Sequence, residues 1–165
     1  MRFPGLSTHS GGISLWLSRI LNRRWFCLFD PEGDINIIHE RLRNDSILLN
    51  TLELKDASDE HIATRIIKRN IWEDLTSNET RMCIYFRPSK QSANIIITEE
   101  ILQIDIHVPA IRDYLAYRGQ SRVFALLNKY EVGNRKYYFE GMVGDLATMP
   151  GLYCVGSRYY FYTTK

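Results

Sequence analysis

Hydrophobic residues recur every three or four positions after residue 34, a spacing typical of helices that bury one face. Ile35, Ile38 and Leu42 follow this spacing, which continues towards Leu48–Leu49. Asp34 precedes them and is a favoured N-cap residue, so we expect the first helix to begin there.

Residues 51–55 are expected to form a short extended segment. Asp56 or Ser58 then predicts the cap of a second helix, because Asp and Ser both accept hydrogen bonds from the first free amides of a helix. The adjoining faces of this helix carry His61, Ile62, Arg65, Ile66 and Arg69.

After residue 80 the hydrophobic period changes from 3.6 to 2, which predicts strands. Residues 81–87 and 95–108 form the two strands of a hairpin, and the turn-forming residues 88–94 join them. Apolar residues fall on odd positions at the start of the second strand and on even positions later. Because a one-residue slip reverses every side chain, we expect a bulge near Thr98–Ile101.

A third helix is predicted over 110–130, with Gly119 weakening its middle by about 1 kcal/mol relative to Ala. Its core-facing stripe comprises Ile111, Leu115, Val123, Leu126, Leu127 and Tyr130. A turn at 132–134 follows, and a second hairpin pairs 136–143 with 152–163 around the loop 144–151. This order predicts an α+β domain: an antiparallel sheet of about four strands, made by two hairpins, with helices packed on one face.

We assign residues 34–165 to this single α+β domain and residues 1–33 to an N-terminal arm. No Asp or Glu precedes Asp30, whereas four arginines and two tryptophans do. A signal peptide is disfavoured because Ser and Arg interrupt the apolar residues and no small-residue cleavage site follows. A short amphipathic helix over 13–26 is one alternative. An arm that is ordered only against a partner is the interpretation we favour.

Composition places the chain among globular domains. Its 165 residues are 45% hydrophobic and 24% charged, which excludes a disordered tail. A net charge of +2 is too small to drive sequence-independent binding to nucleic acid. No apolar run approaches the roughly 20 residues that cross a bilayer, so we expect no membrane partner. The three cysteines, Cys27, Cys83 and Cys154, are far apart and predict reduced thiols in a cytosol.

Candidate catalytic groups are few. Glu53-Leu-Lys55 matches the E-x-K of some metal-dependent nucleases, but the acidic strand residue expected upstream is missing. Gln103, Asp105 and His107 share one face of a strand, where they could hold a metal; a polar face towards solvent or a partner subunit is the simpler interpretation. No Ser/His/Asp or Cys/His order indicates a nucleophile. We therefore expect no catalytic site, no metal, no cofactor and no enzymatic activity.

Tyrosine is concentrated in the second predicted hairpin, together with Arg135, Lys136 and Arg158. Neighbours such as Tyr159 and Tyr160 must point to opposite faces of a sheet, so aromatic residues are expected on its outer face as well. Three interpretations stay open: a protein interface, which is enriched in Tyr and Arg, ordinary cross-strand packing, and a base-stacking platform for single-stranded nucleic acid. The near-neutral charge disfavours the last.

Four segments carry a family resemblance: RMCIYFRP at 81–88, ILQIDIHVP at 101–109, FEGM at 139–142 and TMPGLYC at 148–154. Their order, followed by an aromatic last strand, resembles the tail-terminator and head–tail-joining proteins of tailed bacteriophages, including the collar ring of phage-tail-like particles. The resemblance covers roughly residues 34–163 and does not include the arm.

The resemblance implies a virion protein, assembled in the cytoplasm of a bacterial host, that forms a six-fold ring at the head-proximal end of the tail tube. Its implied partners are copies of itself, the tail tube protein, the head connector and, if the tail is contractile, the sheath protein. A nucleic-acid-binding module that uses the tyrosine-rich hairpin is the alternative function. The interface residues expected from this topology are Gln103, Asp105, His107, Lys90, Asp145, Met149, Arg158 and Tyr160.

Overall fold

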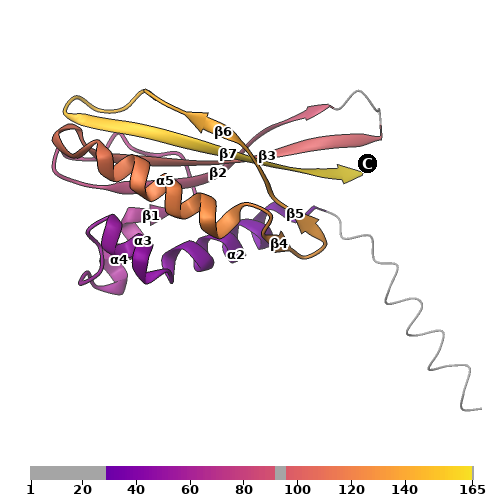
Figure 1. The fold of residues 1–165 in the computed structure, drawn as a ribbon, viewed down its shortest axis with the longest axis horizontal. Coiled ribbons are helices and arrows are strands. Elements are labelled where there is room, and N and C mark those ends of the chain that lie inside the picture. Colours follow the sequence, from indigo (N-terminus) through magenta and orange to yellow (C-terminus); the bar gives the residue numbers. More distant parts are fainter. Residues whose placement is uncertain (1–28, 92–95, 165) are drawn as a thin grey trace, which may run out of the picture.

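A five-stranded sheet with all helices on one of its faces forms the body of the protein (Figure 1). The structure, a computed structural model, describes residues 29–91 and 96–164. The strand order is β1-β2-β3-β7-β6, with bounds Ile66–Ile67, Arg81–Gln91, Ile97–Pro109, Leu152–Thr164 and Tyr138–Val143. The α+β class with helices on one face is confirmed. The sheet has a fifth strand because the short β1 pairs in parallel with β2, whereas the other neighbours are antiparallel as expected.

The layer that covers the sheet consists of short helices and one small ribbon. Its elements are α2 (Pro31–Arg43), α3 (Ser46–Thr51), α4 (Asp59–Arg65), the 3₁₀ turn η1 (Ala110–Arg112), α5 (Tyr114–Leu127) and the strand pair β4 (Glu131–Val132) with β5 (Arg135–Lys136). The ends of β2, β3 and β7 project beyond this layer, and we call this projecting end the sheet tip (Figure 1).

The cap of helix α2 lies four residues before Asp34, at Asp30, so the predicted cap is wrong. The side chain of Asp30 caps the helix by accepting from the Gly33 amide at 3.1 Å, and Pro31 fits the first turn because its missing amide proton is not needed there. Asp34 is instead buried inside the helix. Phe29 already packs against the core, so the folded body includes part of the predicted arm. Residues 1–28, with the helix considered over 13–26, lie outside the described residues.

The helical pattern towards Leu48–Leu49 is broken into two helices at Asn44. Asp45 caps the second one, α3, by accepting from the Leu48 amide at 2.7 Å. The extended segment expected over 51–55 is wrong: the chain makes a turn there, with Glu53 in the left-handed region at φ 60°. Glu53 lies in this turn and not on a strand, and it pairs with Arg112, so the strand geometry of the E-x-K nuclease motif is not formed. The cap of α4 by Ser58 is confirmed.

The predicted bulge is present but lies on the other strand of the hairpin. The register of β2 against β3 shifts between Arg87 and Lys90, opposite Glu100. Strand β3 itself pairs with β7 in one unbroken register from Ile97 to Pro109. As a consequence β2 continues to Gln91 through most of the predicted loop. The last three loop residues, 92–94, and residue 95 of the predicted second strand lie outside the described residues.

The core lies between the sheet and the helices, where helix α2 packs against β2 and even-numbered residues of β3 meet α5. Gly119 permits this contact, because a Cβ at that position would lie 2.8 Å from Cδ1 of Ile106. The predicted helix over 110–130 is shorter than expected. Ile111 falls in the 3₁₀ turn and is exposed, so its assignment to the core stripe is wrong.

Candidate functional site

The face of the sheet opposite the helices, the outer face, carries most of the polar residues singled out from the sequence. One half of it, the roofed half, is covered by the loops 68–80 and 144–151, and the other half, the open half, lies towards the sheet tip. Gln103, Asp105 and His107 of β3 lie in the roofed half and are only 1–4% exposed. The expectation that they form a solvent-facing strip is therefore wrong, because two loops of the same chain cover them. Their expected contact with a partner subunit stays a prediction.

These residues form a connected polar network centred on Asp105. The carboxylate accepts from the Tyr85 hydroxyl at 2.6 Å and from Nε2 of Gln103 at 2.8 Å. The other amide atom of Gln103, Oε1, accepts from Nη1 of Arg87 at 3.0 Å and from Nε of Arg158 at 3.1 Å. Burial raises the pKa of Asp105, while its two hydrogen bonds and the two guanidinium groups act in the opposite direction. The network thus stabilises a carboxylate that burial alone would disfavour.

Gly156 makes room for this network on the neighbouring strand. It is the β7 partner of Asp105, and a Cβ at Gly156 would clash with the Asp105 carboxylate and lie 2.8 Å from Cδ1 of Leu146. Only glycine lets the carboxylate lean across β7 while the loop 144–151 closes above it.

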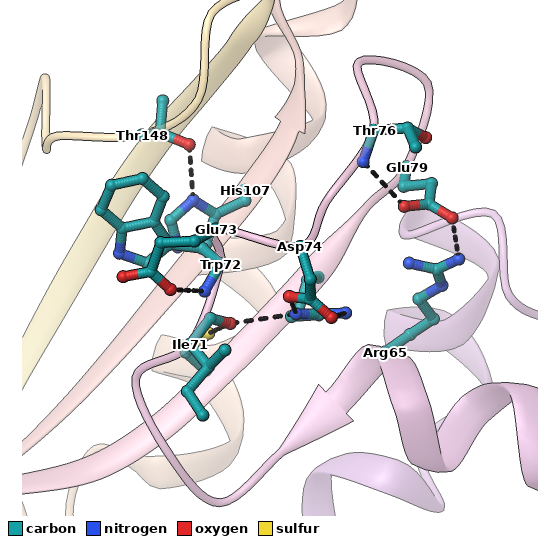
Figure 2. A network of polar contacts seen from close by, with 11 residues as sticks. Arg65, Ile71, Trp72, Glu73, Asp74, Thr76, Glu79, His107 and Thr148 are labelled. Carbon is teal, nitrogen blue, oxygen red and sulfur yellow. Dashed lines mark hydrogen bonds and ion pairs between the residues drawn. The ribbon is translucent and has the colours of Figure 1, made fainter.

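His107 lies next to the network, beneath the indole of Trp72. The two rings are stacked with centroids 6.0 Å apart, and Nδ1 of His107 hydrogen-bonds Oγ1 of Thr148 at 2.9 Å (Figure 2). Nε2 of His107 lies 3.6 Å from Sγ of Cys154. Burial lowers the pKa of His107 to about 4 and raises the pKa of the Cys154 thiol. A neutral imidazole beside a neutral thiol is a packing contact rather than an activated nucleophile.

The loop that carries Trp72 is held at both ends by charged groups. Arg81 donates to the backbone oxygen of Ile71 at 3.1 Å and forms an ion pair with Asp74. Further along, Glu79 forms an ion pair with Arg65 and accepts from the Thr76 amide at 2.9 Å (Figure 2). The guanidinium of Arg65 lowers the pKa of Glu79 to about 2. These contacts hold Trp72 over His107.

A cleft of about 390 Å³ remains between the roof and β2. Its floor is polar, with Tyr85, Gln103 and Asp105, and its walls are mainly apolar, with Trp72, Pro88, Leu146 and Ala147. In residues 29–91 and 96–164, no group of three or more His, Cys, Asp and Glu side chains could hold a metal ion. The cleft therefore offers hydrogen bonds and shape, with a single buried carboxylate.

The open half carries a row of aromatic side chains, of which Tyr138 and Tyr162 are exposed and Tyr160 is half-buried. Tyr160 stacks on Tyr138 of β6 at 5.7 Å between ring centroids and contacts Tyr162 edge-on at 5.5 Å; we call these three residues the tyrosine row. Tyr159 and Phe161 are buried on the helical side, which confirms the expected alternation. Lys90 reaches from β2 across two strands to Glu140 on β6, at 3.3 Å between Nζ and Oε1.

The predicted interface residues fall into three places. Gln103, Asp105, His107 and Arg158 meet in or beside the network. Lys90 and Tyr160 lie in the open half, whereas Asp145 and Met149 lie on the loop that covers the roofed half. Sequence reasoning missed the contributions of four residues, Tyr85, Arg87, Trp72 and Gly156. Tyr85 and Arg87 could have been found, because they alternate on the predicted strand that pairs with the one bearing Gln103 and Asp105.

Comparison with known proteins adds little to this description. No family model matches the chain, and the search of curated proteins found no match to it. Solved structures do resemble it; one of them has 12% sequence identity, and the alignment spans 74% of this chain and 98% of that chain with a TM-score of 0.38. That likeness is too weak to support a function. In the described part of the chain, no helix is long and apolar enough to cross a bilayer.

Proposed function

We propose that this chain is a structural subunit of a phage tail or phage-tail-like particle. In this role it forms a ring with copies of itself at the head-proximal end of the tail tube, ends tube polymerisation and docks to the head connector. The tail tube protein is its partner on one side and the connector on the other, and a contractile tail would add the sheath protein. It acts without catalysis or cofactor, and it resides in the virion after assembly in the bacterial cytoplasm.

The observation that carries the proposal is the tyrosine row beside Arg158 on the open half of the outer face. Tyr and Arg are enriched in protein interfaces because each combines a large apolar surface with hydrogen-bonding groups. Here they sit on strands rather than loops, so little conformational entropy is lost when a partner binds. The roofed half supports this role by holding the same strands in one geometry.

The direct test is electron microscopy of particles from a producer that lacks the gene. Over-long tails of variable length are expected if the protein ends tube polymerisation. Tails of normal length without heads would indicate that the protein joins the tail to the head connector and does not end tube polymerisation. Unchanged particles would contradict both.

A matched pair of variants connects the function to the outer face. Tyr160→Ser with Tyr162→Ser should fail to restore normal tails in the deletion strain, because it removes two of the three rings of the row. Tyr114→Ser with Tyr117→Ser removes two exposed rings on α5 of the helical side and should restore them. Equal complementation by both pairs of variants would show that tail assembly does not depend on the tyrosine row.

A nucleic-acid-binding module is the alternative, because bases could stack on the same tyrosines next to Arg87 and Arg158. A salt titration of binding to single-stranded DNA separates the two functions. Micromolar affinity that falls steeply with salt would favour this alternative.

A further inference from the structure

The helical side of the sheet tip contains a buried carboxylate that forms no ion pair with any described residue. Glu100 is 7% exposed; it accepts from Oγ of Ser89 at 2.6 Å and from Oγ1 of Thr163 at 3.3 Å. None of the ion pairs within residues 29–91 and 96–164 includes Glu100. A buried carboxylate usually has a cationic partner, and two neutral hydroxyls only partly replace the hydration it has lost.

A second polar group at the same place has no hydrogen-bond partner among the described residues. Thr98 precedes Glu100 by two residues on β3, so both side chains lie on the helical side of the sheet. Thr98 is 9% exposed, and its buried Oγ1 makes no hydrogen bond in the described part of the chain. A ligand with several N–H donors would satisfy the hydroxyl of Thr98 and the carboxylate of Glu100 together.

The described part of the chain begins beside these two residues. Phe29 packs edge-on against Phe86 at 5.1 Å and against Phe161 at 5.2 Å between ring centroids, and Phe161 is the β7 partner of Glu100. Arg24 precedes Phe29 by five residues, a span of at most about 18 Å of extended chain. Arg23 and Arg24 of the same chain are therefore within reach of Glu100.

The charge of the preceding segment has the sign that the site requires. Residues 1–28 contain Arg2, Arg19, Arg23 and Arg24 and no acidic residue, a formal charge of +4. The remaining residues carry 17 basic and 19 acidic side chains, a formal charge of −2. A guanidinium has five donors in one plane, which suits a carboxylate with a hydroxyl next to it better than an ammonium does.

We propose that the segment Arg23–Phe26 docks on the helical side of the sheet tip of its own chain, where a guanidinium of Arg23 or Arg24 binds Glu100 and donates to Thr98. The docking site is thus an arginine site of the tip, separate from the tyrosine row on the outer face. It holds whether or not the protein forms a ring, so its test is independent of the proposed function.

The test measures how fast chymotrypsin cleaves the full-length native protein at Trp25 and Phe26. Glu100→Gln keeps both hydroxyl contacts and removes the charge; the double variant Arg23→Gln/Arg24→Gln leaves the described body unchanged. We expect each to speed cleavage about 10-fold, in line with the loss of a charge-assisted hydrogen bond. Combining all three substitutions should add less than about 2-fold, because both changes remove one interaction. Glu99→Gln, on the opposite face of β3, is the matched control and should cleave like wild type.

Several outcomes would overturn the proposal. Unchanged cleavage of the arginine variant would do so, and so would fully multiplied effects in the combined variant, since independent sites multiply. Cleavage that slows as protein concentration rises would assign the site to a second copy's segment instead of the chain's own. Urea unfolding of Glu100→Gln shows whether its body remains folded; if it does not, the arginine variant alone decides.

Discussion

Replacing His107 tests whether the roof over the outer face keeps this side chain neutral. In the unfolded chain a histidine binds a proton near its ordinary pKa of 6.5, whereas burial lowers the pKa of His107 in the folded protein to about 4. Between these values the unfolded state binds the proton and the folded state does not. Stability therefore falls as pH decreases from about 6.5 to about 4. At pH 4.5 the linkage amounts to about 2.5 kcal/mol of lost stability.

Asp105 acts in the opposite direction, because its raised pKa lets the folded protein take up a proton before the unfolded chain does. The measurement therefore compares wild type with His107→Gln, in which Asp105 is retained. Urea unfolding at pH 7 and pH 4.5, followed by far-UV circular dichroism, gives both free energies of unfolding. The advantage of wild type over the variant should shrink by about 2.5 kcal/mol between the two pH values. His61→Gln, at an exposed position on α4, serves as the control. A constant difference between wild type and His107→Gln at both pH values would refute the reasoning.

Three further predictions concern the same framework. Gly156→Ala should lower the free energy of unfolding by about 2 kcal/mol through the clash with the carboxylate beneath the roof, while Gly141→Ala, where a Cβ meets nothing within 4 Å, should change it little; urea titrations compare the two. Asp34→Asn breaks the buried ion pair between α2 and β5 and should cost about 3–5 kcal/mol, which a melting curve would register as a large fall in Tm. Trp72→Ala should expose the imidazole ring of His107, on which the indole stacks. The pKa of His107 should therefore rise towards its ordinary value in an NMR titration. An unchanged titration would show that the indole does not bury this imidazole.

The fold class followed from periodicity, and the errors arose where a local signal competed with a stronger neighbour. Asp34 is a favoured capping residue, but Asp30 caps the helix instead, with Pro31 in the first turn. Because the helix starts earlier, Asp34 lies within it and pairs with Arg135. Strand β1 has only two residues, too few for any period to be recognised. The bulge was expected from the phase change in β3, yet β2 absorbs it, because β3 must keep register with two strands at once.

The candidate site was predictable only in part, because its main feature is the roof. Alternation correctly placed Gln103, Asp105 and His107 on one face of their strand. Whether that face meets water depends on contacts between distant loops, such as Thr148 with His107, which no local pattern encodes. Trp72 lies outside every helix and strand that the periodicity predicts, and nothing in the sequence indicates that its loop folds back over β3.

The pairing of β3 with β7 has a mechanical consequence. All 13 residues of each strand are paired in one register, and the chain leaves this ladder at Thr164. Because the hydrogen bonds of an antiparallel pair run perpendicular to the strands, tension applied along β7 from its end loads them together in shear. Peeling β6 away from the sheet would instead break its few bonds one after another. The body is thus built to bear load along its longest strands and to yield first at its short edge.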